Sequence, residues 1–206
     1  MTQVTTLFWD VGGVILTNGW DRVAREEAAW EFHLDWEDFQ DRHELASPAL
    51  ETGQIMLDQY LERSIFYQPR AFTRDAFKAF MFAQSRVHPE ARALVDQLAR
   101  SRNYLLATIN NEGLQLNRHR ILRFSLRRDF TAFFSSCFLG VRKPDPAIYR
   151  LALQVTQRAP EECVFIDDRP PNLECARRMG MRTIHYQNAQ QLREELRRNG
   201  VALASN

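Results

Sequence analysis

Residues 5–16 read TTLFWDVGGVIL, and this stretch decides the fold. An apolar run over residues 7–9 stops at Asp10, two glycines follow, and the apolar character resumes at Val14. A buried strand ends on an acid and glycines where the backbone must turn and another group must come close. The stretch therefore predicts a central strand that presents Asp10 at its carboxyl end.

Other apolar runs predict strands that lie beside this one. These are residues 103–108, 135–138, 163–166 and 183–185, each separated from the next by a helical pattern. Strands that alternate with helices are typical of an α/β fold with a doubly wound parallel sheet. We therefore expect a Rossmann-like α/β core.

A long segment separates the first two predicted strands. A crossover between parallel strands needs only one helix of about a dozen residues, and the pattern over residues 89–100 supplies it. Residues 17–87 are surplus, and they show four helical patterns. We therefore expect a core domain of residues 1–16 and 88–206, with an inserted helical cap domain of residues 17–87 above the glycine turn.

Composition narrows the function classes. The 206 residues carry a formal net charge of +1, which argues against nucleic acid or an anionic membrane as a partner. No apolar stretch approaches the ~20 residues of a membrane span, and the N-terminal residues lack a signal-peptide pattern. Three cysteines without CxxC spacing fit a reducing compartment. We expect a cytoplasmic protein, and the sequence predicts no particular oligomeric state.

Polar residues stand at the ends of the predicted strands. Asp10, Thr108 and the pair Asp167–Asp168 each follow an apolar run, and Lys143 lies in a KPDP loop. Carboxyl ends of parallel strands meet at one edge of a sheet, where ligands bind. Three carboxylates there need a cation, and an all-oxygen set suits Mg²⁺. Threonine and lysine are donors suited to phosphate. This combination indicates phosphoryl transfer with a carboxylate nucleophile.

The order of these features resembles the four motifs of the haloacid dehalogenase-like hydrolases. The matching segments are FWDVGGV (8–14), LAT (106–108), RKPDPAIY (142–149) and VFIDDRPPN (164–172). The insertion after the first motif resembles the small helical cap of this family. Within the family, the chain is similar to sugar-1-phosphatase-like members and to the phosphatase domain of soluble epoxide hydrolases.

The resemblance implies a catalytic site. Asp10 would attack phosphorus and form an aspartyl phosphate, and Lys143 would neutralise charge on the transferring group. Mg²⁺ would be held by Asp10, the backbone carbonyl of Gly12 and Asp168, with Asp167 as a direct or indirect partner. Thr108 and the N–H of Ile109 would hold phosphate oxygens. The substrate would be a small phosphorylated metabolite, such as a sugar phosphate.

Two positions depart from the family pattern. Most family phosphatases carry a second Asp, a general acid and base, where this chain has Gly12. Such an acid typically contributes roughly 10²–10⁴-fold, so its loss predicts slow release of poor leaving groups. The other departure is Ile109, where a polar residue often follows the motif-two threonine.

Other functions remain open at the level of sequence. A 2-haloacid dehalogenase of the same fold also lacks the second Asp. Those enzymes need no metal, however, and their fourth motif resembles Ser-Ser-Asn, so the pair Asp167–Asp168 favours the phosphatase. A non-catalytic binding protein that has lost its acid is another alternative. A sugar phosphomutase normally relies on the missing acid and is less favoured.

Overall fold

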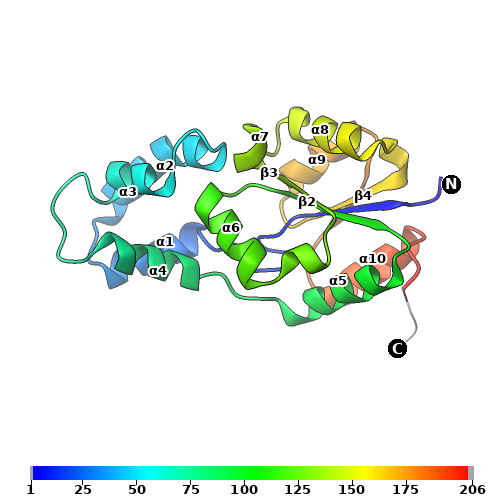
Figure 1. The fold of residues 1–206 in the computed structure, drawn as a ribbon, viewed down its shortest axis with the longest axis horizontal. Helices are drawn as coiled ribbons and strands as arrows, with labels where there is room; N and C mark the ends of the chain where they lie inside the picture. Colours follow the sequence, from blue (N-terminus) through cyan, green and yellow to red (C-terminus); the bar gives the residue numbers. More distant parts are fainter. Residues whose placement is uncertain (1, 204–206) are drawn as a thin grey trace.

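The structure, a computed structural model, describes residues 2–203 and is built on a five-stranded sheet (Figure 1). The strands are β1 (Thr6–Trp9), β2 (Leu105–Asn110), β3 (Ala132–Ser135), β4 (Cys163–Asp167) and β5 (Arg182–His185). All neighbouring strands pair in parallel, in the order β3-β2-β1-β4-β5. The predicted fold class, a doubly wound parallel α/β sheet, is confirmed.

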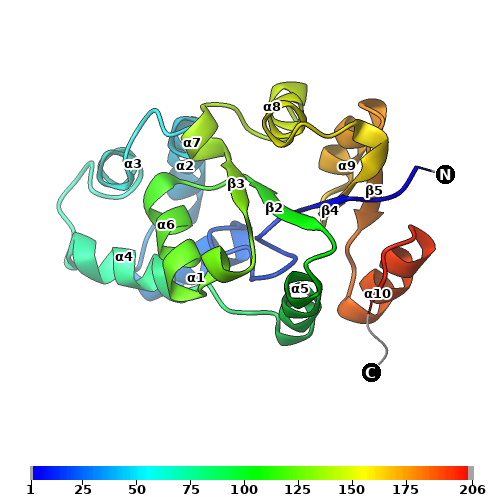
Figure 2. The same ribbon diagram turned by 45° about the vertical axis from the view of Figure 1, so that its right-hand side comes forward.

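Helices cover both faces of this sheet (Figure 2). One face packs against α5 (Pro89–Ser101), α6 (Leu114–Arg123) and α10 (Ala189–Arg198), and the other against α8 (Pro146–Thr156) and α9 (Pro170–Arg178). Strand β1 lies in the middle, with Leu7 and Trp9 in one apolar cluster and Phe8 in the other. Burial on both faces explains why its sequence is continuously apolar rather than alternating.

Residues between β1 and α5 form four further helices beside the carboxyl ends of the strands (Figure 1). These are α1 (Arg22–Glu31), α2 (Trp36–Glu51), α3 (Leu57–Ser64) and α4 (Arg74–Ala83). They share an apolar cluster of their own, which includes Phe39, Tyr60 and Phe77. The two linkers run side by side, since Thr17 N–H donates to the carbonyl of Arg86 at 2.8 Å.

The predicted strand over residues 135–138 is wrong. β3 ends at Ser135, and Ser136–Leu139 forms the short helix α7. The pairing explains the shift, because residues 132–135 lie in register with residues 107–110 of β2. The same pairing carries β2 to Asn110, two residues beyond the predicted end at Thr108.

Helix α2 is longer than its pattern predicted. The helical pattern of the sequence predicts a helix over residues 35–45, whereas α2 continues through Pro48 to Glu51. Phe39, Ala46 and Leu50 are buried along one face, and this packing favours the longer helix over the local cost of the proline. Two short 3₁₀ turns, Leu126–Arg128 and Pro160–Glu162, complete the elements. Every helix within residues 2–203 is too short or too polar to traverse a bilayer.

Candidate active site

A cavity of about 570 Å³ lies between the carboxyl edge of the sheet and the cap helices. Its volume is in the range of small-molecule sites. The core contributes Asp10, Gly12, Lys143 and Asp168 to the lining, and α1 and α2 contribute Arg25 and His43. The strand ends and helices α1 and α2 thus face one another across one polar cavity.

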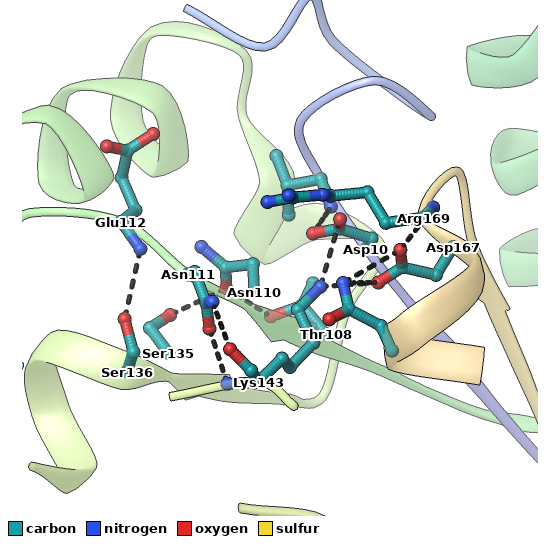
Figure 3. Close-up of polar contacts among 12 residues, drawn as sticks. Asp10, Thr108, Asn110, Asn111, Glu112, Ser135, Ser136, Lys143, Asp167 and Arg169 are labelled. Carbon is teal, nitrogen blue, oxygen red and sulfur yellow. Dashed lines mark hydrogen bonds and ion pairs between the residues drawn. The ribbon is translucent and has the colours of Figure 1, made fainter. Parts of the chain in front are cut away.

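The ammonium of Lys143 lies between two carboxylates (Figure 3). Its Nζ is 2.9 Å from Asp10 Oδ2 and 2.6 Å from Asp167 Oδ2, and all three residues are buried. Burial, together with repulsion from Asp167 and Asp168, raises the pKa of Asp10 to about 8, while Lys143 opposes the rise. Burial alone would lower the pKa of Lys143, but both carboxylates raise it. The single positive charge of Lys143 therefore does not neutralise the carboxylates of Asp10, Asp167 and Asp168.

Both carboxylate oxygens of Asp167 already accept hydrogen bonds from other residues. Oδ1 accepts from the N–H of Arg169 at 2.8 Å and from Asn172 Nδ2 at 3.0 Å. Oδ2 accepts from Lys143 Nζ and from the same Asn172 amide. Asp167 thus holds Lys143 in place and has little capacity left for a metal ion. These two bonds from Asn172 hold the loop that follows β4.

Asp168 has the opposite environment. Its carboxylate lines the cavity, and its buried Oδ1 has no hydrogen-bond partner among residues 2–203. A buried carboxylate oxygen without a partner is costly. Asp10, Asp167 and Asp168 each offer an oxygen within 4.8 Å of the others. The unpaired oxygen and this acidic cluster fit a divalent cation with hard oxygen ligands.

Gly13 makes room for this carboxylate. Its φ is +74°, and a Cβ built there would lie 2.2 Å from Asp168 Oδ2. Only glycine satisfies both the left-handed backbone and the close approach. The second glycine of the opening stretch is therefore a structural requirement of the acidic cluster.

Thr108 and Ile109, which the sequence predicts as phosphate ligands, are not among the residues that line the cavity. Thr108 pairs with Trp9 in the sheet, is fully buried, and its hydroxyl donates to Asn110 Oδ1 at 3.4 Å. Ile109 packs in the apolar cluster on the other face. Because β2 runs on to Asn110, the cavity is lined from this strand end by residues 111–113 instead.

Asn111 is a site residue that sequence reasoning missed. Its Nδ2 donates to the carbonyl of Lys143 at 2.9 Å, and its Oδ1 accepts from the Lys143 N–H at 2.8 Å (Figure 3). This reciprocal pair fixes the backbone that carries the lysine. The available signal was a pair of asparagines directly after an apolar run, a pattern that favours a turn.

Arg120 is a second residue that the sequence did not single out. Its buried guanidinium pairs with Glu112 Oε2 at 2.9 Å and donates to the carbonyl of Thr17 at 2.9 Å and to Ser85 Oγ at 3.0 Å. Thr17 and Ser85 belong to the two segments that connect helices α1–α4 with the sheet domain, so Arg120 joins both segments to α6. Burial raises the pKa of Glu112 to about 7, although Arg120 opposes the rise. Nothing in its helical pattern marks Arg120 as special.

Gly12 faces this guanidinium. A Cβ at residue 12 would lie 3.2 Å from Asn18 Oδ1 and 3.4 Å from Arg120 Nη1. The space beside Gly12 is therefore bounded by an amide and a cation, and neither is a proton donor of suitable acidity.

Comparison with known proteins finds hydrolases among the relatives of this chain. A phosphoserine phosphatase of Thermus thermophilus is 32% identical over 54% of this chain and 45% of its own length. A chloroplast flavin mononucleotide hydrolase of Arabidopsis thaliana is 41% identical over 33% of this chain and 28% of its own length. The matched region thus spans less than half of either relative.

A solved structure matches almost the whole chain. A haloacid dehalogenase family enzyme from Bacteroides thetaiotaomicron, in complex with magnesium, has a TM-score of 0.78. The match covers 95% of this chain and 100% of that one at 18% identity, and it demonstrates the shared fold. The family model of the haloacid dehalogenase-like hydrolases matches residues 4–180. The resemblance in the four motifs is thereby confirmed, and this chain belongs to the haloacid dehalogenase-like hydrolases.

Proposed function

We propose that this protein is a Mg²⁺-dependent phosphatase that hydrolyses a small phosphomonoester, with a sugar phosphate as one candidate, through an aspartyl phosphate on Asp10. The observation that carries the proposal is the arrangement of Asp10, Lys143 and Asp168 at one cavity. Lys143 bonds Asp10 at 2.9 Å, and the buried Oδ1 of Asp168 lacks a partner among residues 2–203. The phosphatase among the relatives supports the same reaction class.

The metal would be held by Asp10, Asp168 and the backbone carbonyl of Gly12. When bound, Mg²⁺ would supply positive charge that offsets the charge of the phosphoryl group and lets a carboxylate approach it. The saturated hydrogen bonding of Asp167 argues that it acts through Lys143 rather than as a ligand.

Asp10 and Lys143 have different roles in the proposed reaction. Asp10 attacks phosphorus, the bond from phosphorus to the ester oxygen breaks, and the leaving oxygen takes a proton from solvent because Gly12 offers none. Water then attacks phosphorus, the bond to Asp10 breaks, and inorganic phosphate leaves. Lys143, fixed by Asp167 and Asn111, provides a positive charge at the transferring group throughout.

Turnover of an aryl phosphate and a panel of sugar phosphates, with and without Mg²⁺, tests this proposal. We expect Mg²⁺-dependent release of phosphate by the wild type and its loss in Asp10→Asn. Asp41→Asn is a matched control, since Asp41 is an exposed carboxylate of α2 outside the cavity. Metal-independent release of halide from 2-haloacids would contradict the proposal, as would the absence of turnover with every phosphate despite Mg²⁺ binding.

A further inference from the structure

Arg25 of α1 has an unusual position for an arginine. It is 7% exposed and lines the cavity from the cap side. Its Nε donates to Gln40 Oε1 at 3.1 Å, and its Nη1 donates to the carbonyl of Trp20 at 2.8 Å. Among residues 2–203, no carboxylate pairs with this guanidinium, and its Nη2 has no hydrogen-bond partner. Asp21 and Glu44 attract this guanidinium from beyond ion-pair distance, so Arg25 places a buried charge without a contacting carboxylate at the cavity.

The other cations of the cavity differ from Arg25. Lys143 and Arg120 are also buried, but each pairs with a carboxylate. The remaining three, Arg22, Arg142 and Arg169, are exposed to solvent. Burying an ion without a counter-ion is among the costliest arrangements in a protein. The charge of Arg25 therefore points to an anion that arrives with the ligand.

His43 of α2 adds a neutral donor beside this charge. The indole N–H of Trp20 donates to Tyr60 Oη at 2.9 Å, and Tyr60 Oη lies 2.8 Å from His43 Nδ1. Because the indole can only donate and the buried Tyr60 hydroxyl needs an acceptor, Nδ1 accepts and Nε2 carries the proton. Burial and the charge of Arg25 lower the pKa of His43 to about 3, so the ring stays neutral.

We infer that Arg25, together with the Nε2–H of His43, binds a second oxyanion of the substrate, at the end away from the scissile phosphate. The substrate class is then a small phosphomonoester that also carries a carboxylate or a second phosphate. This inference rests on the proposed function and narrows it. Arg25 acts as a specificity residue, since it touches the far end of the substrate and not the reacting atoms.

Three matched compounds test this class: propyl phosphate, 3-phosphonooxypropanoate and propane-1,3-diyl bisphosphate. They differ only in a neutral, carboxylate or phosphate tail, so the two anionic arms separate the two sources of the oxyanion. For the wild type with Mg²⁺, we expect kcat/KM for at least one anionic tail to exceed that for propyl phosphate by about 10- to 100-fold, mainly through KM. Arg25→Gln should abolish this preference and Arg25→Lys should retain part of it.

Arg42→Gln is the matched control, because it removes a half-buried cation of α2 that does not line the cavity, and it should keep the preference. Equal kcat/KM for all three compounds in the wild type would overturn the inference. So would an equal loss in Arg25→Gln for all three, since that indicates a structural role through Trp20 and Gln40.

Binding separates failure of the inference from failure of the proposed function. Calorimetric titration of Asp10→Asn with the three compounds needs no turnover. Tighter binding of an anionic tail that is lost on adding Arg25→Gln supports the inference even if no compound is hydrolysed, and such a result would count against the phosphatase alone. Equal binding of all three tails overturns the inference whatever the activity.

Discussion

The carboxylate of Asp168 lies so close to Gly13 that a Cβ atom at residue 13 would come within 2.2 Å of Asp168 Oδ2. Gly13→Ala should therefore displace the Asp168 carboxylate from the acidic cluster. We expect Mg²⁺ affinity, measured by titration calorimetry, and Mg²⁺-dependent activity to fall by on the order of 10²-fold, as for a misplaced catalytic group.

Gly200→Ala separates this effect from backbone strain. Gly200 has φ +79°, similar to the +74° of Gly13, but nothing lies within 4 Å of the position of its Cβ. Both variants should lose about 1–2 kcal/mol of stability in denaturant unfolding because alanine disfavours the left-handed region. Only Gly13→Ala should lose metal binding, and equal metal affinity in the two variants would refute the role of the contact.

Substitution of Thr108 and substitution of Asn111 should have different effects on activity. Thr108 is fully buried and does not line the cavity, so Thr108→Val should leave kcat/KM close to the wild-type value. Asn111 fixes the Lys143 backbone through two hydrogen bonds, so Asn111→Ala should lower kcat by on the order of 10²-fold. Steady-state kinetics with one aryl phosphate compares the two variants directly. A large loss of kcat/KM in Thr108→Val alone would show that Thr108 contacts the phosphate, as the sequence predicts.

Gly12→Asp restores an acid next to Arg120. The new Cβ would meet Asn18 Oδ1 at 3.2 Å, so Asn18 must shift slightly, and Arg120 Nη1 lies 3.4 Å away. If proton donation limits the rate, alkyl phosphates should gain more than aryl phosphates, by about 10-fold or more in kcat. Gly12→Asn has the same size without an acidic proton and should show no such difference. An equal change with both leaving groups would mean that Gly12 does not limit the reaction.

His43 should make the folded state sensitive to acid. Its folded pKa of about 3 lies below the 6.5 of an unperturbed histidine, so the unfolded state binds more protons between these values. Stability therefore falls as the pH drops below about 6.5, and His43 should account for roughly 2 kcal/mol of the loss by about pH 5. Arg25 and Tyr60 face the ring, and a proton on it would meet the Arg25 charge.

His43→Gln removes this titration and keeps an acceptor for Tyr60. Urea unfolding at several pH values should show a smaller acid-induced loss in the variant than in the wild type. Parallel stability curves would show that His43 is not held neutral in the folded protein.

The positions of Asp10 and Asp167 could be predicted from the sequence, because the residues next to them in the chain already mark the strand ends. The apolar run that ends at Asp10 and the one that ends at Asp167 are buried strands, and parallel pairing brings their ends together. Each of these ends could be read because the side-chain chemistry changes abruptly there. The family model matches residues 4–180, a range that contains both strand ends.

The end of β2 could not be predicted from its neighbouring residues in the same way. Ile109 and Asn110 stay in the sheet because β3 pairs with them, and that partner lies more than twenty residues away in sequence. Because the strand continues for two residues beyond Thr108, this residue pairs with Trp9 inside the sheet instead of ending the strand at its edge. Arg25, His43 and Arg120 depend on how the cap lies over the sheet, and helical periodicity carries no information on that placement.

Mass spectrometry of an acid-quenched reaction tests the central claim most directly. The protein is mixed with Mg²⁺ and an aryl phosphate, quenched during turnover and digested. We predict that the peptide containing Asp10 gains the mass of one phosphoryl group, and that the gain is absent from Asp10→Asn and from a reaction without Mg²⁺. Turnover that proceeds without any phosphorylated Asp10, or that persists in Asp10→Asn, would contradict the claim that Asp10 is the nucleophile.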